Sequence, residues 1–515
     1  MDITGPQHFD LLIIGGGING AGIARDAAGR GLSVCLVEKH DLASATSSAS
    51  TKLVHGGLRY LEQYELRRAR ECLIERDRLL AIAPHIVWPL RFVLPHDTGL
   101  RPRWLLRLGL LLYDHIGGRK LLPPARSLDL TSPPHAGVLE ARLTHGFEYS
   151  ACWVDDARLV VLNAVDARER GADVRTRTEC TALARRRDRW EARLKGPQGV
   201  QDVTARMVVN AAGPWADQVL ARALPGRTAA HLRLVKGSHL IMPRLYAGDH
   251  CYIFQNRDRQ LVFAIPYEGD FTLIGTTIDV AFEGDPAGIE ISPEEATAIC
   301  DAANEYFAAD VSPDQAIAAF AGMRPLFDDV AAHNAAAARG YVCELDRGWD
   351  DKAPALLSIF GGKITTYRKL AEHALAKLGV PGGPWTANAP LPGGDIAGRN
   401  FEAFVVAQTA AYMWLPQATV RRMARAYGTR ISRVLGDAGS SDDLGQSFGG
   451  GLSASEVIYL IRHEYARSAE DVLWRRSKLA LHLSAQERAH LVHWFQRFRI
   501  DDQAINAAIA SASPR

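Results

Sequence analysis

The chain has 515 residues, more than one hydrophobic core usually serves, so two or three domains are expected. Its 47% hydrophobic and 23% charged residues are typical of a globular protein, and a net charge of +2 gives no support for nucleic-acid binding. The seven cysteines form no C-x-x-C pair, so we expect neither a disulfide framework nor a metal site. No secretory signal and no apolar run long enough to span a membrane are visible.

The segment 9–25, which reads FDLLIIGGGINGAGIAR, predicts a buried strand, a tight turn and a helix. Its glycines Gly15, Gly17 and Gly20 have the G-x-G-x-x-G spacing of a dinucleotide site. The first glycine permits the turn, the second lets the backbone approach a pyrophosphate, and the third lets the helix pack on the strand. The helix N-terminus then offers unpaired N–H groups to the phosphates.

A second apolar run, 32–37, ends in Glu38, about 20 residues beyond the glycines, where a carboxylate is expected to bind the ribose. The segment 41–51 is rich in small and hydroxyl residues, so it can approach a flat ring and bind its polar edge. The alternative is an ordinary Ser/Thr surface loop. In this part of the chain we expect cofactor contacts at Ile14, Gly15, Gly17, Ile18, Asn19, Gly20, Glu38, Lys39, Thr46, Ser47 and Ser50.

The segment 55–60, HGGLRY, combines a titratable ring with a guanidinium group. His55 could accept a proton near neutral pH, and Arg59 could bind a phosphate or carboxylate in a forked geometry. The alternative is a loop with a hydrogen-bonded histidine and a surface arginine. An amphipathic helix from Leu66 to near Pro84 is expected next.

The segment 104–116, WLLRLGLLLYDHI, is strongly apolar but too short to span a bilayer. Arg101 and Arg103 precede it and Arg107 interrupts it. The pattern fits either a helix that lies in a membrane interface, with its basic residues on anionic lipid, or a core helix. The basic group Arg475, Arg476 and Lys478 is a second candidate for membrane contact.

Later segments are expected to contact the cofactor again and to form a second domain. A strand at 207–210 leads into a small-residue turn at Gly213, which could pass beneath the nucleotide. Arg324 precedes a proline, which favours an extended conformation in which it could face a pocket. Strand-like runs at 232–243, 252–255, 261–266 and 271–277 indicate an antiparallel sheet.

An apolar run at 356–360 ends in Gly361, Gly362 and Lys363, where N–H groups could meet a cofactor edge and the lysine an anion. A Pro- and Gly-rich stretch then indicates a linker at 386–398. Helical patterns follow at 401–415, 419–427, 454–464, 469–479 and 485–497, so we expect a helical C-terminal domain.

Together these motifs make the chain resemble the FAD-dependent glycerol-3-phosphate dehydrogenases, the aerobic respiratory enzymes of bacteria, within the D-amino-acid-oxidase-like flavoprotein superfamily. The resemblance rests on segments spread over nearly the whole chain: IIGGGINGAGIARDAAGRGLSV, ATSSAS-TKLVHGGLRYLE, GFEYSACWVDDARLV, VVNAAGPWAD, LVKGSHL, GMRPLFDD, FGGKITTYRKLAEHAL and LPGGDI. One departure is an extra Ile278 in GTTID, where the family reads GTTD, so no role is assigned to Asp279.

The resemblance implies that sn-glycerol 3-phosphate is oxidised to dihydroxyacetone phosphate, with electrons passing through FAD to a membrane quinone. It places His55 as the proton acceptor and Arg59, Tyr60, Arg324 and Lys363 at the substrate. His239, in KGSHL, is a second candidate base, although a hydrogen-bonded strand histidine is the more ordinary interpretation. The resemblance also implies a homodimer that is peripheral on the cytoplasmic face of the inner membrane, on anionic lipid.

The expected fold is α/β plus antiparallel β. A Rossmann-type FAD-binding domain is predicted at 1–90, 145–230 and 335–385, a substrate domain at 91–144 and 231–334, and an all-α C-terminal domain at 399–515. Two other functions stay open. One is an oxidase that passes electrons from the same substrate to oxygen, and the other is a non-catalytic flavoprotein recruited to membranes.

Overall fold

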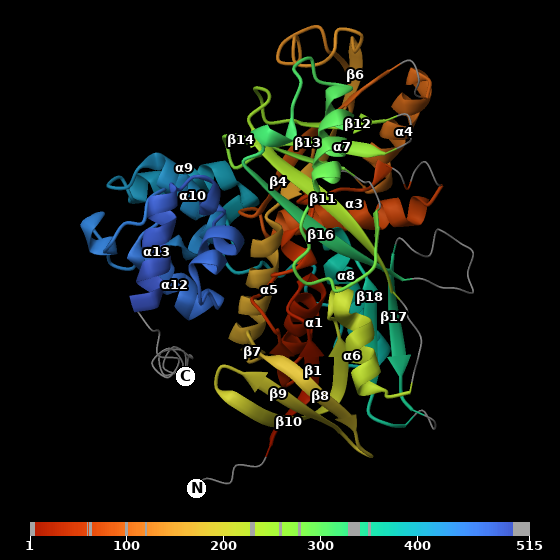
Figure 1. The fold of residues 1–515 in the computed structure, drawn as a ribbon, viewed down its shortest axis with the longest axis vertical. Helices are drawn as coiled ribbons and strands as arrows, with labels where there is room; N and C mark the ends of the chain where they lie inside the picture. Colours follow the sequence, from red (N-terminus) through yellow and green to blue (C-terminus); the bar gives the residue numbers. More distant parts are fainter. Residues whose placement is uncertain are drawn as a thin grey trace.

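The computed structural model describes residues 6–58, 60, 64–97, 101–118, 121–226, 232–256, 260–276, 280–327, 340–348 and 352–497. Two β-sheets follow each other along the long axis of the molecule, and a helical domain lies to one side (Figure 1). Arg59, Ile278 and Asp279, which the sequence analysis singles out, lie outside the described residues.

The first sheet has the strand order β17-β18-β10-β1-β2-β7, and β1 pairs in parallel with β2 and β10. Leu11, Leu12 and Ile13 of β1 are fully buried, as expected for a central parallel strand covered on both faces. The path strands are β1 (Gln7–Ile14), β2 (Val34–Val37), β7 (Asp173–Arg175), β10 (Gly199–Asn210), β17 (Tyr341–Asp346) and β18 (Leu356–Gly361), and the hairpin β8 (Glu179–Arg185) and β9 (Trp190–Gly196) joins β10.

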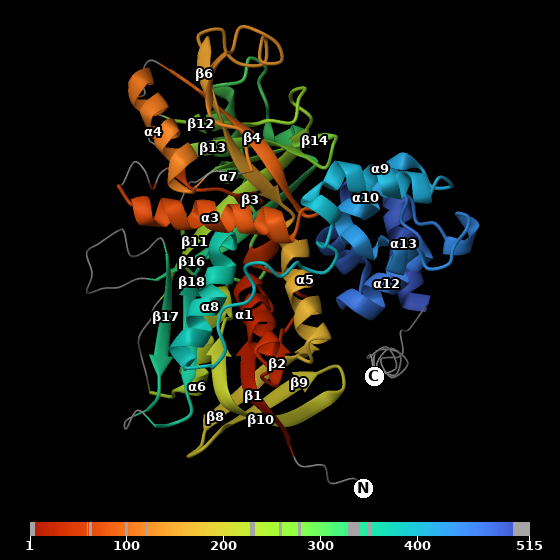
Figure 2. The same cartoon turned by 180° about the vertical axis from the view of Figure 1, so that it is seen from behind.

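Helix α1 (Ile18–Gly29) begins directly after the glycine turn, so the strand, turn, helix and second strand predicted at 9–38 are confirmed. It packs between α5 (Asp156–Glu169) and α8 (Tyr367–Leu378), which lie on either side of it in Figure 2. On the other face of the sheet, α6 (Ala216–Ala223) packs against β10 and β18.

The second sheet has the order β15-β11-β14-β13-β12-β4-β6-β3, with β16 on β11 and β5 on β6. The four strands predicted after residue 231 are confirmed, and α7 (Pro293–Asn304) packs on this sheet. The strands are β3 (Leu53–Val54), β4 (Val87–Pro95), β5 (Arg126–Asp129), β6 (His145–Val154), β11 (Leu232–Pro243), β12 (Cys251–Gln255), β13 (Leu261–Tyr267), β14 (Phe271–Thr276), β15 (Val280–Phe282) and β16 (Ala318–Phe327).

Strands β3 and β6 belong to the second sheet, although the sequence analysis places their residues in the FAD-binding domain. Local sequence predicts that a strand exists, but its partner is set by tertiary contacts. Two helices accompany this sheet: α3 (Leu66–Ile82), which ends before Pro84 as predicted, and α4 (Arg103–Ile116).

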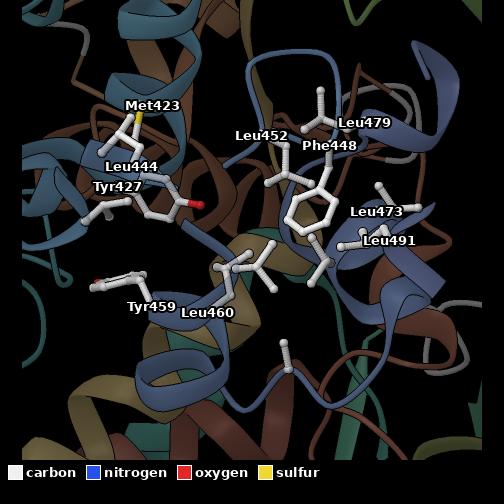
Figure 3. Packing of buried hydrophobic residues seen from close by; sticks show 14 of the residues in the cluster. Met423, Tyr427, Leu444, Phe448, Leu452, Tyr459, Leu460, Leu473, Leu479 and Leu491 are labelled. Carbon is white, nitrogen blue, oxygen red and sulfur yellow. The ribbon is translucent and has the colours of Figure 1, made fainter. Parts of the chain in front are cut away.

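The C-terminal domain is helical, as predicted. Its described elements include α9 (Phe401–Ala411), α10 (Gln417–Tyr427), α11 (Ile431–Leu435), α12 (Ala454–Glu464), the π-helix η9 (Asp471–Arg476) and α13 (Ala485–Arg497). Its core brings together side chains such as Met423, Leu460 and Leu491, which Figure 3 shows around a common centre. The domain therefore has a hydrophobic core of its own.

The segment predicted as a linker packs against helices α3 and α1. The N–H of Leu391 donates to the carbonyl oxygen of Ile82 at 2.9 Å, and Leu391 is almost fully buried. Arg25 of α1 donates to the carbonyl oxygen of Ala389 at 2.9 Å. The segment that joins the helical domain to the rest of the chain is thus held in place by hydrogen bonds.

Candidate active site

A cavity of about 860 Å³ opens where the turns after β1, β2, β10 and β18 meet strand β16. This is the carboxyl end of the parallel strands, where α/β sheets bind their ligands. The predicted cofactor residues that line it are Ile14, Gly15, Gly17, Ile18, Asn19, Glu38, Lys39, Thr46, Ser47, Gly213, Gly361 and Gly362. Most of the predicted cofactor contacts therefore share one cavity, while Gly20, Ser50 and Lys363 lie outside its wall.

The three motif glycines shape the turn at the cavity floor. Gly15 has a φ of +113°, and a Cβ there would overlap the backbone of Ala211, directly after β10. Gly17 precedes the first turn of α1 and lines the cavity. A Cβ on Gly20 would overlap the carbonyl oxygen of Gly15, so this glycine allows α1 to pack on the turn behind the wall.

Glu38 stands at the end of β2 and its carboxylate closes the glycine turn. Its oxygens accept the N–H groups of Gly16 at 2.7 Å and of His40 at 2.8 Å. Burial raises the pKa of Glu38, and the two N–H groups oppose that change. Next to it, the Lys39 ammonium lies 4.0 Å from the ring centroid of Trp215, which also lines the cavity.

The hydroxyl-rich segment after β2 ties three distant parts of the chain together. The Ser47 hydroxyl accepts the N–H of Ile18 at 3.0 Å, and the Thr46 hydroxyl donates to the carbonyl oxygen of Met323 at 2.6 Å. Ser50 turns away from the cavity, because its hydroxyl donates to Asp156 at 2.7 Å. Asp156 also accepts the buried Lys52 ammonium at 2.8 Å, a pair that sequence reasoning missed because the two residues are far apart in the chain.

Lys363, Tyr60 and His55 gather beside the Gly361–Gly362 turn, although none of the three lines the cavity itself. The Lys363 ammonium donates to the Tyr60 hydroxyl and lies 4.4 Å from that ring's centroid. Burial, together with the charge of Lys363, lowers the pKa of His55 to about 4. The structure therefore joins the HGGLRY segment to the GGK turn.

Arg324 lies on β16 between Met323 and Pro325, both of which line the cavity. The carbonyl oxygen of Pro325 lies close to Gly361, so this part of β16 runs beside the turn that carries Lys363. Arg324 on β16 and Lys363 in the turn after β18 are therefore carried by neighbouring segments, although neither lines the cavity and Arg324 is exposed.

His239 lies on the second sheet, where its ring stacks on Phe320 with centroids 4.9 Å apart. Its Nε2 atom is 3.1 Å from the Thr51 hydroxyl oxygen. Burial, and then the charges of Lys52 and Arg324, lowers the pKa of His239 to about 3. The ring is therefore neutral behind the cavity wall.

The C-terminal domain also lines the cavity, which sequence reasoning missed. Trp474, Arg475 and Lys478 form part of the wall. Arg476 is 1% exposed and Lys478 4%, so the basic group proposed for membrane contact is buried in the protein. The only sequence signal was the cluster of cations itself, which does not distinguish an internal ion-pair network from a lipid-facing patch.

Residues 10–367, which carry both sheets and the cavity turns, match the family model described as FAD dependent oxidoreductase. The chain belongs to this family of FAD dependent oxidoreductases. Residues 384–493 match a second model, described as the C-terminal domain of alpha-glycerophosphate oxidase.

The oxidoreductase is 51% identical to the glycerol-3-phosphate dehydrogenase of Pseudomonas aeruginosa, over 95% of each chain. It is 49% identical to the D-erythritol 1-phosphate dehydrogenase of Brucella abortus, over 95% of this chain and 98% of the relative. The structure of the glycerol-3-phosphate dehydrogenase from Bacillus halodurans complexed with FAD is similar, with a TM-score of 0.75 and 28% identity over 98% of this chain and 93% of that one. These similarities confirm the predicted family and fold class.

FAD is the cofactor of this oxidoreductase, as predicted. The cavity fits it: the glycine turn leaves the backbone open to a pyrophosphate, and Glu38 stands at the end of β2. The Oδ1 atom of Asn19 is buried at the wall and accepts no hydrogen bond within the described residues, so it is ready for a donor of the cofactor. Gly15, Gly17 and Glu38 would hold one end of FAD, and the Gly361–Gly362 turn would meet the other.

Proposed function

We propose that this oxidoreductase oxidises sn-glycerol 3-phosphate at C2 to dihydroxyacetone phosphate, with electrons passing through FAD to a membrane quinone. The observation that carries the proposal is the gathering of Lys363, Tyr60 and His55 beside the cavity-lining Gly361–Gly362 turn, next to the strand that carries Arg324. The 51% identity to a glycerol-3-phosphate dehydrogenase supports it.

A phosphate dianion must be compensated by cations when it leaves water. Lys363, in the turn after β18, and Arg324, on β16, are proposed to supply two such charges and together to fix the substrate's orientation. Arg59, which lies outside the described residues, is proposed as a third. Tyr60 holds the Lys363 ammonium and thereby positions it.

Oxidation of a secondary alcohol requires that its hydroxyl proton be removed as the hydride leaves. His55 is proposed as the proton acceptor, because it is neutral at physiological pH and lies beside Lys363. A bound phosphate would offset the Lys363 charge and raise the pKa of His55, which makes the ring a better base when substrate is present. FAD supplies the hydride acceptor, and the chain's residues bind, orient and deprotonate the alcohol.

The test is anaerobic mixing of the FAD-loaded protein with glycerol 3-phosphate. The flavin absorption should bleach, and a quinone analogue should restore it. Glycerol at the same concentration should leave the flavin oxidised because it lacks the phosphate. A flavin that stays oxidised with glycerol 3-phosphate contradicts the proposal, and hydrogen peroxide formed in air without a quinone analogue would support the oxidase instead.

D-erythritol 1-phosphate is a second candidate substrate, because the chain is 49% identical to a dehydrogenase that is named for it. Both compounds carry a phosphate and a secondary alcohol, so the same cations and base could serve either. The ratio of their kcat/KM values in flavin reduction decides between them.

We also propose that α4 attaches the protein to an anionic lipid surface. Within the described ranges, no helix is long and apolar enough to cross a membrane. On one face of α4, Trp104, Leu108 and Leu111 are 68%, 55% and 54% exposed, and Leu112 continues that face. Arg101, Arg103 and Arg107 supply positive charge beside them. An exposed apolar face with basic neighbours is typical of a helix lying in a membrane interface.

Attachment would place the flavoprotein beside its quinone, on the cytoplasmic face of the inner membrane as proposed from the family. Co-sedimentation with vesicles that contain anionic lipid tests it, and full recovery in the supernatant would count against it. The homodimer stays a prediction, for which an oligomeric-state measurement is the test.

A further inference from the structure

The C-terminal helical domain forms one wall of the FAD cavity, although the FAD dependent oxidoreductase model ends at residue 367. The residues of this domain that line the cavity are Ser468, Glu470, Asp471, Trp474, Arg475 and Lys478. In Figure 1 the domain lies beside α5, on the flank of the first sheet. The C-terminal domain is therefore packed against the rest of the chain and is not connected to it by the linker alone.

Two arginines of this domain hold the loop that follows β2. The Nε atom of Arg475 lies 2.6 Å from a carboxylate oxygen of Asp41. Arg476 adds two contacts to the same carboxylate, at 2.5 and 2.8 Å. Asp41 is only 3% exposed, so its charge depends on these guanidinium groups. The loop is the one that carries Glu38 and Lys39.

A second pair continues the connection. Asp471 accepts Arg475 and also Arg177, which follows β7, lines the cavity and donates its backbone N–H to the His40 carbonyl oxygen of the loop at 2.8 Å. Asp471 further accepts the N–H groups of Arg467 and Ser468, so it is fixed within its own domain. The wall is therefore a closed network of buried charges that spans both domains.

The backbone conformation of residues 471–478 directs Arg475 and Lys478 towards the cavity wall. Residues 471–476 form a π-helix, a rare conformation that is frequent at functional sites. Leu473, within this segment, and Leu479, just after it, point into the core of the helical domain in Figure 3. Lys478 has a φ of +61° and is nearly buried at the cavity wall, where its ammonium is 3.8 Å from Asp155. The helical core thus anchors a short segment of cations that faces the cofactor cavity.

We propose that the C-terminal domain retains FAD, because Arg475 and Arg476 hold the Asp41 loop at the cavity and Lys478 adds positive charge to its wall. Arg475 and Arg476 are positioning residues in this scheme, since they act through Asp41. Loss of these ion pairs would loosen the Asp41 end of the loop, next to Lys39, while Glu38 stays hydrogen-bonded to Gly16 and to the residues around β7. FAD would then dissociate faster while the fold persists.

The test compares two arginines of the same domain in the FAD-loaded full-length protein. Arg475→Met removes one of the guanidinium groups on Asp41. Arg430→Met is the matched control: its side chain is also 12% exposed, and it pairs with Glu169 of α5, but neither residue lines the cavity. Free flavin fluorescence after dilution gives the dissociation rate of FAD, and thermal unfolding reports the fold.

Arg475→Met should release FAD roughly tenfold faster, the size expected for loss of a charge-assisted contact that orders the site, whereas Arg430→Met should change the rate less than about twofold. Equal rates for both variants, or an unchanged rate in Arg475→Met, would overturn the proposal. If Arg475→Met fails to fold, Asp41→Asn replaces it with the same expectation. No substrate is used, so failure of the substrate assignment leaves this result intact.

Discussion

The Nδ1 atom of His55 accepts a hydrogen bond from the backbone N–H of Gly57 at 3.1 Å. The neutral ring consequently carries its proton on Nε2. To accept a proton from a substrate hydroxyl, the Nδ1 atom must give up its hydrogen bond with the Gly57 N–H. Residue 57 has a φ of +65°, a conformation that favours glycine. The short HGG loop therefore sets the tautomer of the proposed base.

Replacement of His55 by asparagine tests its role in proton transfer. We expect kcat to fall by roughly 10²–10⁴, the usual contribution of a general base, with FAD content unchanged because His55 does not line the cavity. His373→Gln, on the exposed side of α8, is the control and should keep full activity. A kcat for His55→Asn within about threefold of the parent would shift the role to His239.

Lys363 and Tyr60 should affect substrate binding unequally. Lys363→Met removes a charge-assisted contact to the phosphate, worth about 1.5–3 kcal/mol, so KM should rise at least about tenfold. Tyr60→Phe keeps the charge and loses only the hydroxyl that positions it, so its effect should be several-fold smaller. Steady-state kinetics with glycerol 3-phosphate measure both, and a larger effect of Tyr60→Phe would contradict this order.

The buried histidines should make folding stability depend on acidity. His85 is fully buried, and burial together with the charges of Arg158 and Arg425 lowers its pKa to about 3. The unfolded chain binds this proton near pH 6.5, so stability is full above that pH and falls as the pH drops from 6.5 towards 3. The free energy of unfolding, measured in urea, should be lower at pH 5 than at pH 7.5 in the parent. The His85→Gln variant should reduce this difference by about 2 kcal/mol. The same difference in parent and variant would refute this.

The sequence predicts elements well where the signal is local. The glycine turn, the four strands after residue 231 and the five C-terminal helices all follow from apolar spacing and from proline and glycine positions. The partners of these elements are not local properties. Asn19 donates to the carbonyl oxygen of Gly361 at 3.0 Å across 342 residues, and no periodicity reveals such a contact.

Charge was the least informative signal. The cations at 475, 476 and 478 look the same in sequence as those at 101, 103 and 107, yet the first group is buried against Asp41 and Asp155 while the second flanks an exposed apolar face. Whether a basic cluster meets an acid or solvent depends on where distant carboxylates lie in the fold. The family resemblance supplied the site residues, and the structure supplied their neighbours.

The apolar face of α4 should determine lipid binding without affecting chemistry. Leu108→Asp with Leu111→Asp places two carboxylates on that face, so co-sedimentation with anionic vesicles should be lost through both lost burial and repulsion. Flavin reduction by substrate in solution should stay unchanged. The control is Met413→Asp, which changes another exposed apolar residue, in the helical domain. This variant should bind vesicles like the parent. If the α4 variant still sediments, another surface carries the attachment.

Two Gly→Ala changes should have opposite effects on stability. Gly20 lies where a Cβ would overlap the carbonyl oxygen of Gly15, so Gly20→Ala must push α1 away from the turn and should greatly reduce FAD binding and thermal stability. Gly109 is inside α4 with no atom within 4 Å of a new Cβ, so Gly109→Ala should stabilise the protein by up to about 1 kcal/mol through helix propensity. Thermal unfolding with and without added FAD measures both changes. The residue change is identical in the two variants. A loss of thermal stability in Gly20→Ala alone would therefore show that the contact between the turn and α1 is the cause. Equal changes in thermal stability in both variants would contradict that explanation.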